Sequence, residues 1–348
     1  MSEFEELKNK KIALIGGAGF IGHNLALRLQ SLGASVEIID GMQVNNLLSL
    51  IDNVDNLPYP ELARSIITER TKLLKKANIN LRVQDVRDYH ALTRLLNVIK
   101  PQVIIQLAAV SHANRSNKDP YSTFDHSFRT LENSLDWARG GSSSVEQFIF
   151  FSSSMVYGNF QTDQVDEKTH CEPLGIYGAL KYGSEKIVIG YNQTFDLPYT
   201  IIRPSALYGE RCISRRVGQI FIENSLMGKE IVMSDKGQES LDFTYINDLV
   251  DGIIRCIGNK NAINQVFNLT YGKACSIANM SEIIKKHFPN IKIRNVERDK
   301  LMPKRGTLNV DKAKDLIGYN PSWPLEKGYT QYINWYKKFI NENPNLIE

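Results

Sequence analysis

Cysteine is scarce in this sequence, and the few cysteines stand far apart. No two of them form a CxxC pair, so they fit neither a zinc site nor a disulfide framework. We therefore expect reduced thiols, no metal centre and a cytoplasmic protein. The four cysteines among the 348 residues are Cys171, Cys212, Cys256 and Cys275.

Long apolar runs and a strong charge of one sign are also missing. The most apolar stretch, Val103–Val110, is far shorter than the roughly 20 residues that span a bilayer. The amino terminus, MSEFEELKNKK, has no apolar centre of the kind found in secretory signals. The 42 Lys and Arg residues barely exceed the 38 Asp and Glu residues, which is too small an excess to indicate a nucleic-acid surface. We expect neither a membrane nor a nucleic-acid partner.

What the sequence does contain is a regular alternation of short apolar segments with segments of helical period. Apolar strands that alternate with helices are typical of a parallel sheet covered by helices on both faces. We expect strands at Lys11–Ile15, Ser35–Ile39, Leu81–Gln84, Val103–Gln106, Gln147–Phe151 and Tyr199–Ile202, and helices at Phe20–Ser31, Tyr89–Val98, Tyr121–Ala138 and Ile176–Tyr191.

A glycine-rich turn, GGAGFIG at residues 16–22, follows the first expected strand and opens the first expected helix. Gly16 permits the tight turn, Gly19 lets the backbone approach a pyrophosphate, and Gly22 lets helix and strand pack closely. In this position the turn predicts a dinucleotide site. The residues expected to contact the dinucleotide here are Gly16, Gly19, Phe20, Ile21 and Gly22.

Acidic residues end the second and third expected strands. The carboxylate of Asp40 can accept hydrogen bonds from the adenosine ribose and repel a 2′-phosphate. Because residues 41–43 contain no Lys or Arg, we expect NAD rather than NADP. Asp85, followed by Val86, can reach the adenine amino group, although a helix cap is the alternative interpretation.

These patterns predict an α/β fold with two domains. Residues 1–204 are expected to form a Rossmann-type, doubly wound parallel sheet that binds NAD. Residues 205–348 are expected to form mainly a smaller mixed α/β domain for the substrate, and a return of segments near 240–270 to the first domain stays open. A helical insertion at about 44–80 can cap the adenosine half of the cofactor, contact another subunit or serve neither purpose.

A second group of polar residues suits acid–base catalysis. Ser153 follows the expected strand Gln147–Phe151, and Tyr177 and Lys181 stand four residues apart in an expected helix. Residues at that spacing lie on one face of a helix, so the lysine ammonium can stabilise the tyrosine phenolate. Lys181 can also hold a ribose hydroxyl of the cofactor, and Ser153 can polarise the substrate oxygen. Tyr177 would then act as general base during hydride transfer.

With these motifs in this order, the chain resembles the extended short-chain dehydrogenase/reductases, specifically their nucleotide-sugar epimerase/dehydratase branch. The resemblance extends over nearly the whole chain. The segments RPSALYG at 203–209 and DFTYIND at 242–248 are similar to the family elements RPxxxYG and DFxYVxD, and GYNP at 318–321 is similar to a late LGxxP turn.

The resemblance implies NAD as cofactor, a nucleotide-diphosphate sugar as substrate and a homodimer. It implies catalytic roles for Ser153, Tyr177 and Lys181, and it implies that Arg305 binds the nucleotide phosphates. The segment after the fourth strand, with Leu107, Ala108, Ala109 and His112, would line cofactor and sugar. In such dimers the helices near Tyr121–Ala138 and Ile176–Tyr191 pair across a two-fold axis. The first carries an apolar stripe that would serve equally well as core, formed by Phe124, Phe128, Leu131 and Leu135.

The sequence departs from the family in places that bear on the reaction. Family members that eliminate water carry Thr-Asp-Glu where this chain has residues 153–155, and neither Ser154 nor Met155 suits that chemistry. Ser154 and Met155 are instead expected to contact the sugar. The usual Asn of RPxNxYG is Ala206, and the usual Arg before Asp-Phe, a diphosphate contact, is Leu241. We hypothesise that one of three nearby arginines supplies the missing charge: Arg211, Arg215 or Arg216.

A 4-epimerase that works through a transient 4-keto sugar is the leading interpretation. A 4-keto reductase or 4-dehydrogenase would use the same scaffold with net consumption of cofactor. An atypical dehydratase would need another acid or base, for example Cys212 or His112. A non-catalytic protein that senses the dinucleotide is the alternative outside enzymes, and an intact Ser153, Tyr177 and Lys181 argues against it.

Overall fold

The computed structural model describes residues 4–52, 57–110, 113–141, 143–297 and 303–346. Its centre is a seven-stranded sheet in the order β12-β7-β5-β4-β1-β2-β3, in which all neighbours run parallel. The strands are β1 Lys11–Ile15, β2 Ser35–Asp40, β3 Asn80–Val83, β4 Val103–Gln106, β5 Gln147–Phe151, β7 Tyr199–Arg203 and β12 Gln265–Asn268. The chain order reverses between β1 and β4, which is where a doubly wound sheet opens a crevice for ligands.

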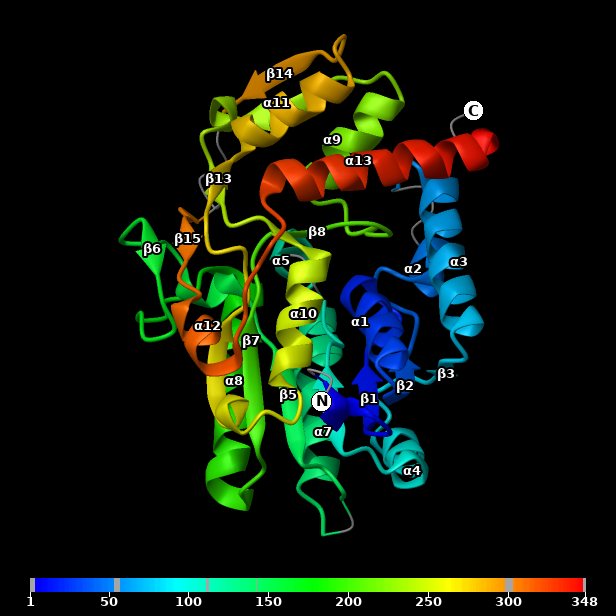
Figure 1. Cartoon of the computed structure of the whole chain (residues 1–348), viewed down its shortest axis with the longest axis vertical. Coiled ribbons are helices and arrows are strands. Elements are labelled where there is room, and N and C mark those ends of the chain that lie inside the picture. The colour runs from blue at the N-terminus through cyan, green and yellow to red at the C-terminus, as the bar shows by residue number, and fades with distance from the viewer. Residues whose placement is uncertain (1–3, 53–56, 111–112, 142, 298–302, 347–348) are drawn as a thin grey trace.

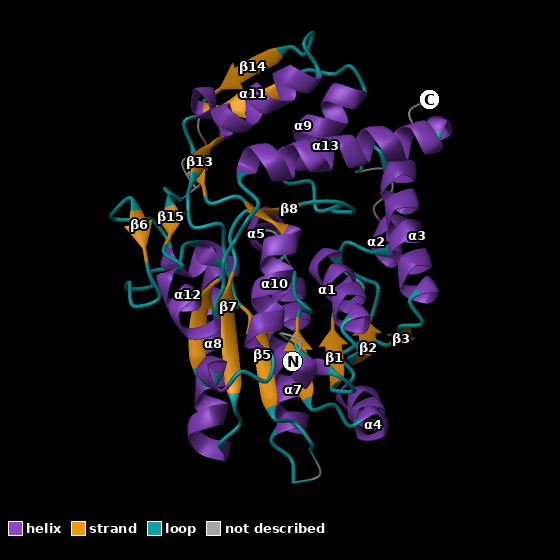
Figure 2. Cartoon of the chain, in the orientation of Figure 1, coloured by secondary structure: helices purple, strands orange, loops and turns teal. Residues whose placement is uncertain are grey.

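Alternate residues of these apolar strands face opposite sides of the sheet and build two cores. On one side Ile12 and Leu14 of β1 pack in the same core as the helices α1 and α10. On the other side Ala13 and Ile15 share a core with α4, α7 and α8. The sheet is therefore buried on both faces (Figure 2), as the near-continuous apolar strands require. The covering helices are α1 Phe20–Ser31, α4 Tyr89–Ile99, α7 Thr130–Ala138, α8 Gly175–Phe195 and α10 Ile246–Cys256.

The helix expected at Tyr121–Ala138 is interrupted in the structure. The Asp119 side chain caps a short helix, α6 Pro120–Phe124, and a π-helical turn at Asp125–Arg129 separates it from α7. Such wide turns shift the register of side chains and occur often at functional sites. Here the turn brings residues of this segment to the ligand crevice, as described below.

A smaller layer lies over the carboxyl ends of the strands (Figure 1). In it β14 pairs in parallel with β9, and α11 packs against both α9 and α13. Residues 246–268 leave this layer, because α10 packs against α1 and β12 joins the sheet beside β7. The elements of the layer are α9 Val217–Leu226, β9 Ile231–Ser234, α11 Ile277–His287, β14 Ile293–Val296 and α13 Leu325–Glu342.

Residues 41–79 form the insertion between β2 and β3. Its long helix, α3 Pro60–Lys76, packs on α1, and the carboxyl-terminal part of α13 lies across one end of it (Figure 1). Among the described residues no helix is long and apolar enough to cross a bilayer. The remaining short elements are α2 Leu47–Asp52, α5 Ala113–Lys118, α12 Asp311–Ile317, β6 Gln164–Val165, β8 Leu207–Tyr208, β10 Ser240–Leu241, β11 Thr244–Tyr245, β13 Cys275–Ser276 and β15 Thr307–Leu308.

A buried ion pair joins α8 to the end of β7. Arg203 donates through Nε and Nη2 to the two carboxylate oxygens of Glu185, at 2.9 and 2.7 Å. Ser152 Oγ donates to the same carboxylate, and Arg203 Nη1 donates to the hydroxyl of Tyr157 at 2.9 Å. Both charged side chains are almost fully buried. The pair therefore fixes the orientation of α8 relative to the strand ends.

Removing one member of this pair should be more harmful than removing both. Arg203→Leu leaves the buried charge of Glu185 uncompensated and is expected to lower the free energy of unfolding by about 3–5 kcal/mol. The double variant Arg203→Leu with Glu185→Leu is expected to recover most of that loss, because no buried charge remains. Urea denaturation followed by circular dichroism measures both. If the double variant were less stable than Arg203→Leu, the loss of free energy of unfolding would come from lost packing rather than from an uncompensated charge.

Candidate active site

The crevice at the strand ends holds a cavity that suits a dinucleotide. We call it the cofactor cavity. The glycine turn, the ends of β2 and β3 and the segment after β4 form its walls. The sequence-predicted residues that line it are Gly16, Gly19, Phe20, Ile21, Gly22, Asp40, Asp85, Val86, Leu107, Ala108 and Ala109. The structure thus brings these residues together from four separate parts of the sheet.

The glycines of the turn fit the close approach that a pyrophosphate needs. Gly16 has φ 79°, and a Cβ there would lie 2.4 Å from Ala108 N. A Cβ at Gly22 would lie 2.3 Å from Gly17 O, where α1 packs on the turn. At Gly19, by contrast, a Cβ would meet only Gly16 O, at 3.6 Å, and would occupy the cavity itself. Glycine at position 19 is therefore explained by a ligand rather than by packing.

The two acidic residues of the cofactor cavity are held differently. Asp40 accepts hydrogen bonds from Ala18 N (2.9 Å) and Met42 N (2.7 Å), and burial raises the pKa of its carboxyl. The oxygens of Asp85 accept from the guanidinium of Arg87 and from Gln43 Nε2. Partial burial would raise the pKa of Asp85, but the bonds from Arg87 outweigh it and hold that pKa well below its usual range. The structure thus gives Asp85 an ion-pair role in addition to the expected contact with adenine.

Sequence reasoning missed one charged residue of this cavity, Arg70. It lies on the insertion helix α3, is fully buried, and donates from Nε to Arg211 O at 2.9 Å. Burial lowers the pKa of Arg70 to about 10. The signal was present in the sequence: Leu62, Ile66, Arg70 and Leu74 repeat every fourth residue, so one arginine interrupts a buried stripe. Further residues of the insertion in the cavity wall are Gly41, Gln43, Val44 and Asn45.

The π-helical turn and the start of α7 supply two more residues that the sequence did not suggest. His126 of the turn and the buried Thr130, the first residue of α7, both line the cofactor cavity. Thr130 Oγ1 donates to His126 O at 2.9 Å, which ties the two residues together. His112, which was expected nearby, lies outside the described residues.

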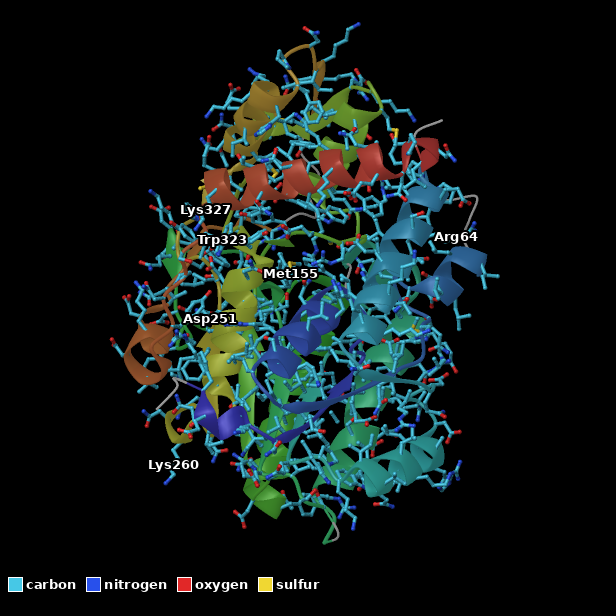
Figure 3. All side chains as sticks on the ribbon, turned by 45° about the vertical axis from the view of Figure 1, so that its right-hand side comes forward. Arg64, Met155, Asp251, Lys260, Trp323 and Lys327 are labelled. Carbon is cyan, nitrogen blue, oxygen red and sulfur yellow. The ribbon has the colours of Figure 1, made fainter. Side chains whose placement is uncertain are left out.

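A second cavity adjoins the first, and we call it the substrate cavity. Ile21, Leu107, Ala109, Leu207 and Arg216 line both cavities, so the two are continuous. The sequence-predicted residues that line the substrate cavity are Ser153, Ser154, Met155, Tyr177, Lys181, Arg216 and Arg305. Figure 3 labels Met155 in the interior of the molecule, between the sheet and α13.

The catalytic candidates come from β5 and α8. Ser153 lies two residues after the end of β5, and its Oγ accepts from Met155 N at 3.2 Å at the start of a short 3₁₀ turn. Lys181 is buried, and its ammonium donates to Phe151 O at 2.6 Å. Burial lowers the pKa of Lys181 to about 8, with a smaller opposing effect of Glu185. Tyr177 is half-buried, one helical turn before Lys181 on the same wall.

Two of the three arginines hypothesised to bind a diphosphate are placed elsewhere. Arg211 Nε donates to His23 Nε2 (3.0 Å) and its Nη2 to Asn24 Oδ1 (3.1 Å), so it faces α1. Arg215 pairs with Glu223 on α9. Neither lines the two cavities, because nearby acceptors on the helices engage them. Arg216 lines both cavities and is the one of the three that the structure places at the site.

The apolar stripe proposed for a dimer divides between two environments. Leu131 and Leu135 are fully buried in the core beneath the sheet, so the core interpretation is right for them. Phe124 and Phe128 stack on each other at 5.1 Å between ring centroids, and Phe124 is exposed. The π-helical turn accounts for the division, because it contains Phe128 and directly follows Phe124, whereas both leucines lie after it in α7.

The element DFTYIND anchors the loop that forms one wall of the substrate cavity. The buried carboxylate of Asp242 accepts from Thr270 Oγ1, Gly272 N and Leu308 N, at 3.0 to 3.2 Å. Burial raises the pKa of Asp242 to about 6. The neighbouring Leu241, which stands where the resembling proteins have Arg, does line the cavity. Because Leu241 is apolar, positive charge in this cavity comes from other residues that line it, such as Arg216 and Arg305.

Comparison with known proteins fits this geometry. Residues 12–270 match the NAD dependent epimerase/dehydratase family. The chain belongs to that family. The prediction of the family, of the Rossmann-type fold and of NAD as the cofactor is thereby confirmed.

Individual relatives cover nearly the whole chain. An uncharacterised UDP-glucose epimerase of Bacillus subtilis is 29% identical over 93% of this chain and 96% of its own length. UDP-glucuronate 4-epimerase 1 of Arabidopsis thaliana is 26% identical over 95% of this chain and 78% of its own length. The crystal structure of UDP-glucuronic acid 4-epimerase from Bacillus cereus, in complex with UDP-glucuronic acid and NAD, superposes with a TM-score of 0.82. That match is 24% identical and covers 94% of this chain and 99% of the other.

Proposed function

We propose that this protein is an NAD-dependent nucleotide-sugar 4-epimerase. The observation that carries the proposal is the convergence of Ser153, Tyr177 and Lys181 on one cavity that is continuous with the cofactor cavity. A base, a hydroxyl donor and a cation around one reacting oxygen are the set that oxidation of an alcohol needs. Relatives of this family named as 4-epimerases support the choice of reaction.

Tyr177 is the proposed general base. The ammonium of Lys181, one helical turn away, stabilises the phenolate by its charge. The phenolate takes the proton of the sugar's C4 hydroxyl while Ser153 donates a hydrogen bond to the same oxygen. Bound NAD supplies the hydride acceptor and donor at C4. The 4-keto sugar rotates within the cavity and presents its opposite face to the hydride donor. Tyr177 then returns the proton to the C4 oxygen, and C4 has the inverted configuration.

The residues that accompany this set in the cavity argue against elimination of water. Met155 is half-buried in the substrate cavity, and a thioether neither gives nor takes a proton. Cys212 also lines the cavity, with its Sγ 3.0 Å from Ser214 Oγ. Neither Ser154 nor Met155, the residues next to Ser153, therefore offers the further acid or base that elimination would need, whereas Tyr177 offers the base that epimerisation needs.

Isomerisation without added cofactor is the expected activity. The purified protein is incubated with UDP-, GDP-, CDP- and dTDP-sugars, and the products are followed by NMR and mass spectrometry. We expect a product of unchanged mass with inverted C4. Tyr177→Phe keeps the ring but removes the base, so its rate should fall by roughly 10²–10⁴-fold while NAD still binds.

Other outcomes of this experiment separate the remaining candidates. A mass change of two units, with cofactor consumed, would replace the epimerase by a reductase or dehydrogenase. A loss of water would indicate a dehydratase. Full biological activity of Tyr177→Phe without turnover would support a sensing protein.

The rate should decline in alkaline solution. Because burial places the pKa of Lys181 at about 8, the ammonium that stabilises the phenolate is present below that pH and is lost above it. We expect kcat/KM to fall as the pH rises through about 8, measured from initial rates across the neutral and alkaline range. Lys181→Arg stays charged throughout and should lose this decline although its rate is lower. The same decline in Lys181→Arg would assign the titration to another group.

We also propose a homodimer that forms through α6 and the first turn of α8. Tyr121 and Phe124 of α6 and Ile176 of α8 are exposed, although they are large and hydrophobic. The two helices contact each other, so these side chains belong to one side of the molecule. Light scattering should give twice the mass of 39.5 kDa, and Phe124→Glu should shift the protein towards the monomer. A monomeric wild type would refute the dimer.

A further inference from the structure

The substrate cavity contains one carboxylate that the proposed mechanism does not use. Glu239 lines this cavity together with the cations Arg216 and Arg305. Within the described residues, Glu239 Oε1 and Arg305 Nε are both buried and without a hydrogen-bond partner. The negative charge of Glu239 acts on Arg305, so the two lie near each other, but these two atoms do not bond to one another. The carboxylate of Glu239 and the guanidinium of Arg305 thus both line the substrate cavity, and each has a hydrogen-bonding atom without a partner.

The backbone around Glu239 holds it in place. Its carbonyl accepts from Ile277 N at 3.0 Å, which ties the residue to the start of α11. Gly237, two residues earlier, has φ 74°, and a Cβ there would lie 2.7 Å from Ala278 N. On the other side, β10 pairs with β13, and Asp242 is fixed by three hydrogen bonds. The backbone that carries this carboxylate is therefore held firmly at the wall of the cavity.

An unpaired buried oxygen and an unpaired buried N–H are each costly, and a ligand that pairs both would offset the cost. Arg305 and Arg216 suit the diphosphate of a nucleotide-sugar. The carboxylate of Glu239 only accepts hydrogen bonds, so it needs a donor from the same ligand. An ammonium donor would face two guanidiniums at close range, which is unfavourable. The donor must therefore be a neutral group such as a hydroxyl.

We propose that Glu239 binds the vicinal hydroxyls of the substrate's ribose, and that it thereby selects ribonucleoside over deoxyribonucleoside diphosphates. This inference rests on the proposed function. The covalent order of a nucleotide-sugar places the ribose beyond the diphosphate, away from the reacting carbon at Tyr177. Glu239 belongs to the smaller layer, where its carbonyl is bonded to the start of α11, whereas Tyr177 belongs to α8 beside the sheet, and Arg305 feels the charge of both. A carboxylate across a ribose diol is the arrangement that Asp40 offers to the cofactor.

The test measures binding rather than turnover. The NAD-loaded protein is titrated calorimetrically with matched pairs of nucleoside diphosphates: UDP and 2′-deoxy-UDP, GDP and 2′-deoxy-GDP, CDP and 2′-deoxy-CDP. In the pair that binds best, the ribonucleotide should bind about tenfold more tightly, because the deoxy form leaves one carboxylate oxygen unpaired. Glu239→Ala should bring the two affinities within about twofold. Glu239→Gln, which keeps an acceptor and the shape, should give an intermediate ratio.

The control is Gln238→Ala, an exposed neighbour on the same loop that does not line the cavity. It should keep the ratio of the wild type. Equal affinities for the two members of each pair in the wild type, or an unchanged ratio in Glu239→Ala and Glu239→Gln, would overturn the proposal. The proposal would also be overturned if the Glu239 variants preferred a different base while the ratio of ribonucleotide to deoxyribonucleotide affinity stayed constant. That result would assign Glu239 to binding of the base. If no nucleoside diphosphate binds, the proposed function fails as well, whereas isomerisation without ribose preference leaves that function intact.

Discussion

The attachment of α8 to the carboxyl ends of β5 and β7 is the constraint on which the site depends. Lys181 donates to the last carbonyl of β5. One helical turn further along α8, Glu185 forms the buried ion pair with Arg203 and accepts a hydrogen bond from the hydroxyl of Ser152. A helix held at two consecutive turns can neither slide nor rotate about its axis. Tyr177, one turn before Lys181, therefore has a defined position beside Ser153. Arg203 of the RPxxxYG element thus positions the helix that carries the proposed base, although Arg203 itself lines neither cavity.

The parts of the fold that follow a local period were predictable from the sequence. The strands β1, β4 and β5 occur at the expected residues, because each is a short apolar run between turns. The helix interrupted at Asp125–Arg129 was not, since nothing in its apolar spacing marks a widened turn. In the site, the glycine turn and the pair Tyr177 and Lys181 each lie within a few residues of sequence. Their proposed roles could be inferred because each depends on local structure, a strand-to-helix turn in one case and one face of a helix in the other.

What escaped prediction depends on tertiary contacts between distant segments. Arg211 and Arg215 looked equivalent to Arg216 in the sequence, yet their destinations are set by His23 and Glu223, which lie on other elements. Arg70 reaches the cofactor cavity from an insertion whose purpose the sequence left open. Glu239 gave no signal at all, since a single acidic residue before a short strand is ordinary. Only the fold shows that its carboxylate stands beside two cations.

The buried chain of contacts through Arg70 has a further consequence for the cofactor. Arg70 holds the carbonyl of Arg211, the side chain of Arg211 holds His23, and His23 Nδ1 bonds to the carbonyl of Gly19. Hydrogen bonds therefore connect the insertion, the loop after β8 and the glycine turn to one another. All three segments line the cofactor cavity, so these bonds join the walls that would surround a bound dinucleotide. Moving one of these walls away from the others would break at least one of the bonds.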